Sequence, residues 1–139
     1  ILSPNDCLNY IPQKKLPSAF LHAAKAVKKG GIFWLDISSA YKLRHKVADN
    51  ISADDREDVT YLSFNSLAKD RVEMDVTLFI TRKDGAFDRF DEHHTQYIHE
   101  EEDVSAALEA AGFALVRTEG HLGTCKEGSD RLNFICRKK

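Results

Sequence analysis

The sequence is poor in cysteine and has no obvious export signal. Its three cysteines, Cys7, Cys125 and Cys136, form no CxxC pair in 139 residues. An odd number of cysteines at these spacings argues against a disulfide framework and a zinc ribbon. It favours a location in the reducing cytoplasm for the protein. The first residues, Ile1–Asp6, contain no initiator methionine, basic segment or apolar core. We therefore expect a cytoplasmic protein that is processed or is a fragment of a longer one.

The chain also has no large excess of charge of one sign and no long apolar run. The chain has 22 acidic and 20 basic residues, a net charge of −2, and its basic residues are scattered. This gives no electrostatic case for binding nucleic acid. No apolar run approaches the roughly 18 residues that a membrane helix needs. Apolar residues are 42% and charged residues 30%, as in globular proteins, and the length predicts one domain over residues 1–139.

Glycine-rich phosphate loops are absent, since neither GxGxxG nor GxxxxGK[ST] occurs, and there is no GxSxG elbow. The pair Gly30-Gly31 instead marks the end of a helix that begins near Pro17 and has Lys28 and Lys29 in its last turn. The apolar residues of this helix recur with helical spacing: Phe20, Leu21, Ala24 and Val27.

A continuous apolar run, Ile32–Ile37, follows this helix and predicts a strand that is buried on both faces, with Trp34 in the core. A helix followed by such a strand is half of a βαβ unit. Near the end of the chain, Glu100–Asp103 and Gly112 mark the start and stop of another helix. The strands Phe113–Thr118 and Arg131–Arg137 then form a closing antiparallel pair.

The middle of the chain has a different periodicity. In Arg71–Arg82, apolar residues alternate with residues that are polar except for Phe79, which predicts an antiparallel strand with one buried face. The expected buried residues are Val72, Met74, Val76, Leu78 and Ile80. Lys83–Gly85 is a hairpin turn, and further strands are expected at 58–66 and 86–97. Together they predict a three-stranded antiparallel meander, inserted at residues 57–98 into an α/β chain.

Polar side chains follow both buried strand ends. Asp6, Asn9 and Tyr10 come after the apolar pair at the start of the chain, and Asp36 lies at the end of Ile32–Ile37. Open α/β sheets bind ligands at this edge, where acceptors, an amide and a flat ring are useful. The alternative, that Asp6 and Asn9 form a turn and Tyr10 only packs, is equally open from the residues alone.

Three histidines, His93, His94 and His99, lie close together in sequence. His93 and His94 are neighbours in a predicted strand and point to opposite faces, so we expect no metal site. One of these histidines could still accept a proton in a pocket.

Three segments resemble motifs of class I S-adenosylmethionine-dependent methyltransferases. Asn5–Ile11 is similar to the motif xDSLNYL, with Cys7 in place of Ser, and Val27–Ile37 is similar to LKPGGxFxFD, with Lys29 in place of Pro. His94–Gln96 with Glu100–Phe113 is similar to HxQ…EEL…LLxxAGF. The order and spacing of these segments match the C-terminal half of the family.

The resemblance implies a partial Rossmann-like α/β sheet, made of the family's fourth to seventh strands, with the meander as a lid. It implies methyl transfer from S-adenosylmethionine to a small-molecule acceptor by the full-length protein. By the same resemblance, Asp6 and Asn9 contact the cofactor, and Tyr10, His94 and Gln96 face the acceptor. It identifies no catalytic base and no metal.

The family's glycine-rich cofactor loop and its ribose-binding acidic residue have no counterpart in this chain. We therefore expect the chain alone to be inactive and to bind the cofactor poorly. The sheet edge at Ile32–Ile37 would be exposed, which predicts a homodimer. The rival hypothesis is a non-enzymatic α+β binding or dimerisation module.

Overall fold

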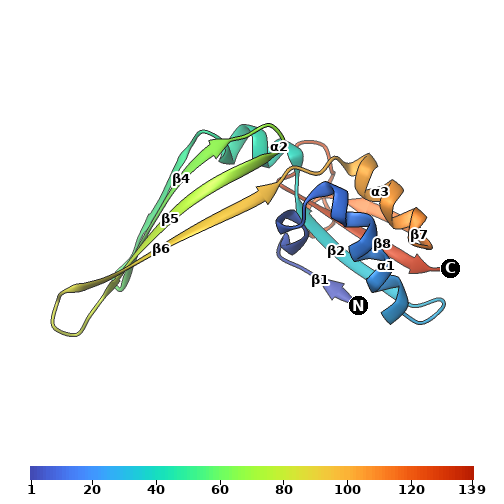
Figure 1. Ribbon diagram of the computed structural model, residues 1–139, viewed down its shortest axis with the longest axis horizontal. Coiled ribbons are helices and arrows are strands. Elements are labelled where there is room, and N and C mark those ends of the chain that lie inside the picture. Colours follow the sequence, from blue (N-terminus) through green and yellow to red (C-terminus); the bar gives the residue numbers. More distant parts are fainter. The chain divides into compact units, whose positions relative to one another are not determined.

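A four-stranded mixed sheet forms the first of two units in the computed structural model, which describes residues 1–139 (Figure 1). This unit comprises Ile1–Lys42 and Tyr97–Lys139, and the second unit is Leu43–Gln96. The strand order of the first sheet is β1 (Leu2–Ser3), β2 (Ile32–Ser38), β8 (Arg131–Lys138) and β7 (Phe113–Glu119). β1 is parallel to β2, and β8 is antiparallel to both β2 and β7. The predicted α/β sheet with a closing antiparallel pair is confirmed.

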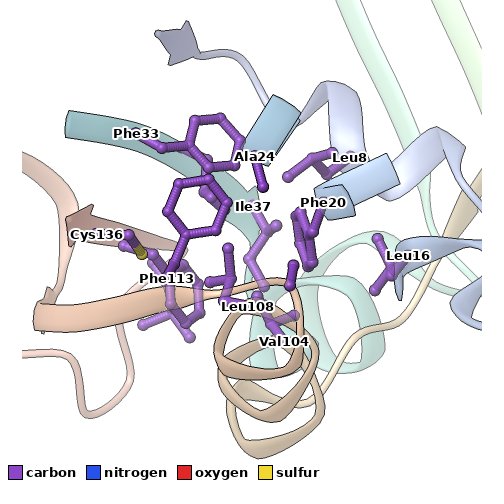
Figure 2. Packing of buried hydrophobic residues seen from close by; sticks show 14 residues of the cluster. Leu8, Leu16, Phe20, Ala24, Phe33, Ile37, Val104, Leu108, Phe113 and Cys136 are labelled. Carbon is purple, nitrogen blue, oxygen red and sulfur yellow. The ribbon is translucent and has the colours of Figure 1, made fainter. Parts of the chain in front are cut away.

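The core of this unit lies between one face of the sheet and two helices, α1 (Leu16–Ala26) and α3 (Glu101–Ala110). Strand register selects the sheet residues that face the helices, because Phe33 lies opposite Cys136 and Leu35 opposite Phe134. Figure 2 shows the aromatic rings of the core packed together, and the ring centroids of Phe33 and Phe113 are 5.3 Å apart. The core residues of the helices are Leu16, Phe20, Ala24, Val104 and Leu108.

Trp34 is not a core residue, contrary to the prediction. It is half-buried and points to the sheet face away from α1 and α3, because alternate residues of a strand point to opposite faces. Ile32, at the start of β2, is 38% exposed. The apolar run of β2 therefore does not mean complete burial of both faces within this chain.

Helix α1 ends earlier than the lysine pair suggested. Pro17 lies in its first turn as predicted, but Val27 is already extended, with φ −87° and ψ 130°, so Lys28 and Lys29 lie outside the helix. The early stop lets Gly30 and Gly31 hydrogen-bond to β8 just before β2 begins, since the Gly30 N–H donates to the Lys138 carbonyl and the Lys138 N–H donates to the Gly31 carbonyl, both at 2.9 Å. Gly30 has φ +78°, a conformation that glycine adopts without strain.

The second unit is a four-stranded antiparallel sheet, and the prediction of three strands missed one. Its order is β3 (Ile51–Asp55), β4 (Val59–Leu67), β5 (Arg71–Thr81) and β6 (Phe87–Tyr97). The missed strand, β3, is an edge strand with every residue exposed, so it has no apolar alternation to reveal it. A turn joins β3 to β4, and in it the Arg56 N–H donates to the Val59 carbonyl at 2.9 Å.

Strand β5 keeps its predicted alternation, but its burial declines along its length. Val72 and Val76 are buried, Met74 and Leu78 are half-buried, and Ile80 is 41% exposed. The prediction that Ile80 is buried is wrong because it lies near the hairpin end of the strand. The predicted turn is confirmed, since the Gly85 N–H donates to the Arg82 carbonyl at 3.0 Å.

The chain passes between the two units twice, after Lys42 and after Gln96. A short helix, α2 (Ala40–Lys42), ends the first segment of the first unit, and a π-helical turn, Leu43–Val47, begins the second unit. No helix in the structure has the length and apolar character needed to cross a membrane.

Candidate functional site

A buried asparagine ties together the ends of β1 and β2. Asn9 lies in the 3₁₀ turn Cys7–Tyr10 after β1 and is fully buried. Its Oδ1 accepts the Ser38 N–H at 2.9 Å, and its Nδ2 donates to the Ser38 carbonyl at 3.2 Å and the Tyr97 carbonyl at 3.0 Å. Both amide hydrogens and the amide oxygen are thus engaged by the protein, and this fixes the turn against the end of β2.

Asp6 begins the same turn in an unusual backbone conformation. Asn5 and Asp6 both have positive φ, 62° and 47°, a region that Asn and Asp enter more readily than other side chains. The Asp6 N–H donates to Asp36 Oδ1 at 2.6 Å, and Asp6 Oδ2 accepts the Ser38 hydroxyl at 3.1 Å. The end of β2 therefore holds both the backbone and the carboxylate of Asp6.

Arg131, the first residue of β8, joins these two carboxylates. Its Nη2 donates to Asp6 Oδ1 at 3.0 Å, and its Nη1 lies 2.8 Å from Asp36 Oδ1. Burial lowers the pKa of the Arg131 guanidinium, but the charges and hydrogen bonds of Asp36 and Asp6 outweigh burial and raise it above its ordinary value. We call the three residues Asp6, Asp36 and Arg131 the carboxylate clasp.

Sequence reasoning missed Arg131. Arg131 and Asp6 are 125 positions apart, and no local pattern relates them. The available signal was strand direction, because β8 runs antiparallel to β2 and therefore begins where β2 ends, with Arg131 opposite Ser38.

An open pocket of about 490 Å³ adjoins the carboxylate clasp within the same unit. Asp36 and Arg131 line it, as do Asn5 and the ring of Trp34. Asn133 also lines it and is held by donating from its Nδ2 to the Gly120 carbonyl at 2.8 Å. The pocket thus combines charged groups, an aromatic ring and an amide at the carboxyl ends of two parallel strands.

The other predicted site residues lie elsewhere. Tyr10 is 46% exposed and lines a second open groove, of about 540 Å³, with Pro12 and residues of α1. His94 and Gln96 lie on β6 of the second unit. The His94 Nε2 is 2.8 Å from Glu92 Oε2, and Gln96 is buried.

The adjacent His93 has different partners. Its Nδ1 lies 2.7 Å from Asp75 Oδ1 and its Nε2 lies 3.1 Å from Glu73 Oε2, both on β5. The hydrogen bond with Asp75 is the main reason why the pKa of His93 is raised. No group of three or more His, Cys, Asp or Glu side chains has the arrangement of a metal site.

His99 contacts the backbone of the turn that contains Asn9. It is fully buried, and its Nε2 is 3.1 Å from the carbonyl oxygen of Leu8, the residue before Asn9. Its Nδ1 is buried without a hydrogen-bond partner. Burial lowers the pKa of His99, so the imidazole is neutral near pH 7.

These features define an α/β protein with a polar site at the carboxyl ends of two neighbouring parallel strands, the usual ligand-binding edge of open sheets. No protein-family model matches the chain. Two curated relatives match 96% of it: a Geobacillus sp. (strain WCH70) protein at 27% identity and YqeM of Bacillus subtilis (strain 168) at 29% identity. Both names describe proposed methyltransferases, and the chain spans 56% of the length of each.

Solved structures give the same class. An S-adenosylmethionine-dependent methyltransferase from Clostridium acetobutylicum is 26% identical, with a TM-score of 0.91 over 99% of this chain and 57% of that one. The amino pentose methyltransferase CalS10 from Micromonospora echinaspora, solved with S-adenosylmethionine bound, is 16% identical, with a TM-score of 0.75 over 99% of this chain and 58% of that one. The chain is thus similar in sequence and fold to the C-terminal half of class I S-adenosylmethionine-dependent methyltransferases, as its motifs indicated.

Proposed function

We propose that the full-length protein transfers a methyl group from S-adenosylmethionine to a small-molecule acceptor, and that this chain supplies one part of the site. The observation that carries the proposal is the carboxylate clasp at the ends of β1 and β2, in a chain similar to methyltransferases. Within that fold, this edge is where a ligand is expected.

The residues present fit one end of the cofactor. A carboxylate that is itself held by protein donors is a suitable acceptor for the ammonium group of a methionine moiety. Asp6 has this character, with 17% of its side chain exposed. The chain has no glycine-rich turn for the remainder of the cofactor. We therefore propose that residues outside this chain complete the site and that the chain alone is inactive.

S-adenosylmethionine, when bound, supplies an activated methyl group on a sulfonium. The protein contributes chiefly by holding the acceptor in line with that group and by accepting the acceptor's proton where one is lost. We propose that Asp6 binds the cofactor directly. Asn9, whose polar atoms are all engaged, acts by holding the Asp6 turn in place. Tyr10, His94 and Gln96 are proposed for the acceptor side.

The experiment is a transfer assay with full-length protein and methyl-labelled S-adenosylmethionine. The acceptor panel includes small amines and amino sugars, because one structural neighbour is an amino pentose methyltransferase. We expect label in a low-mass product, and a reduced rate when Asp6 is changed to Asn. A full-length protein that binds no S-adenosylmethionine would overturn the proposal and favour the non-enzymatic binding module.

A further inference from the structure

We infer that Arg131 is a positioning residue, which fixes the Asp6 carboxylate in the orientation that receives the methionine end of S-adenosylmethionine. The inference rests on the proposed function, and it adds a role for a residue that lies 125 positions from Asp6.

The first argument is charge. One guanidinium lies within 3.0 Å of an oxygen of each of two carboxylates. The side chains of Arg131, Asp6 and Asp36 are only 21%, 17% and 5% exposed, so water screens these charges weakly. Without Arg131, two carboxylates of the same charge would be left close together without a cation between them, which is costly when the groups are largely buried.

The second argument is backbone conformation. Asn5 and Asp6 adopt positive φ in succession, a region that is open to Asn and Asp, so the contacts of Asp6 decide whether this conformation is held. The Asp6 N–H is held by the Oδ1 atom of Asp36 that also lies against Arg131. The three residues therefore form a closed ring of contacts, in which Arg131 keeps Asp36 in place and Asp36 keeps the Asp6 backbone in place.

The third argument is the shape of the guanidinium. Arg131 uses two different nitrogens, Nη2 toward Asp6 and Nη1 toward Asp36. A planar fork can bridge two carboxylates in this way, whereas a lysine ammonium is a single point of charge on a flexible stem. Arg131 is also anchored in strand β8, which is hydrogen-bonded on both sides. Both nitrogens face carboxylates, so in this inference Arg131, although it also lines the pocket, acts on a ligand by holding Asp6.

The test compares two ligands by calorimetric titration of the full-length protein. S-adenosylhomocysteine carries the amino-acid end, and 5′-methylthioadenosine lacks it. We expect Arg131→Gln to weaken S-adenosylhomocysteine by about ten- to a hundredfold, the scale of a misaligned charged hydrogen bond, and to leave methylthioadenosine unchanged. Arg131→Lys, which keeps the charge, should give an intermediate loss and decides the question if the Gln variant does not fold.

The matched control is Arg137→Gln, because Arg137 lies exposed on the same strand and donates to the Gly30 carbonyl at the opposite end of β8. It should bind both ligands like the unmodified protein. Equal weakening of both ligands in the Arg131 variants would show general structural damage and overturn the inference, as would unchanged binding of both. If the unmodified protein binds neither ligand, the proposed function itself fails.

Discussion

Replacing Asn9 by Ala should strongly destabilise the first unit, although the substitution removes few atoms. The substitution deletes three hydrogen bonds, two to Ser38 and one to Tyr97, at a position that is fully buried. Each bond contributes about 0.5–1.5 kcal/mol, and the buried backbone groups left without partners cost more. We expect the free energy of unfolding to fall by about 2–4 kcal/mol, a large share of the ~5–15 kcal/mol of a typical domain.

The assay is urea unfolding of the 139-residue chain, followed by the fluorescence of Trp34, its only tryptophan. Asn9→Asp should cost at least as much as Asn9→Ala, because a carboxylate would then face two carbonyl oxygens. The matched control is Gln13→Ala, which removes one hydrogen bond to Asp103 on the surface and should cost no more than about 0.5 kcal/mol. If Asn9→Ala is no more harmful than Gln13→Ala, Asn9 does not join the strand ends as we describe.

Three further predictions concern other parts of the chain. Val76→Asp places a carboxylate at a site that is 6% exposed and should lower the free energy of unfolding in urea by about 3 kcal/mol or more, whereas Asp75→Ser, on the opposite face, should change it little; equal effects would contradict the register of β5. His99 has a lowered pKa in the folded chain, so the unfolded chain binds the proton more readily. The contribution of neutral His99 to the free energy of unfolding is therefore complete above pH 6.5 and should be lost as the pH falls below it. We expect His99→Gln to reduce this dependence of stability on pH. An unchanged slope would refute this role of His99. Burial raises the pKa of Cys136 to about 11, so a thiol reagent at pH 8 should label only the two exposed cysteines until urea is added, and labelling of three in the folded chain would refute the burial.

Periodicity in the sequence was enough to predict the main elements. The alternation in β5, which only Phe79 interrupts, and the apolar run in β2 identified two strands, and glycines marked the start of β2 and the end of β5. Strand β3 escaped because an exposed edge strand needs no apolar side chains. Burial of Ile80 was overestimated because alternation shows which face a residue occupies but not how far the covered surface extends.

The candidate site was predictable only in part. Asp6 and Asn9 lie in the segment that follows the end of β1, and their position pointed to the ligand-binding edge. Arg131 reaches the same edge only through the pairing of β8 with β2, which is a tertiary feature. The role of Asn9 in joining backbone segments follows from distances that no sequence pattern contains.

The most direct measurement of the central claim is a paired calorimetric titration with S-adenosylmethionine. The full-length protein and the isolated 139-residue chain are titrated under the same conditions. We predict one-to-one binding by the full-length protein and little or no binding by the chain alone, because the chain holds the carboxylate clasp but no glycine-rich turn. Absence of binding by the full-length protein, or equally tight binding by the isolated chain, would contradict the account.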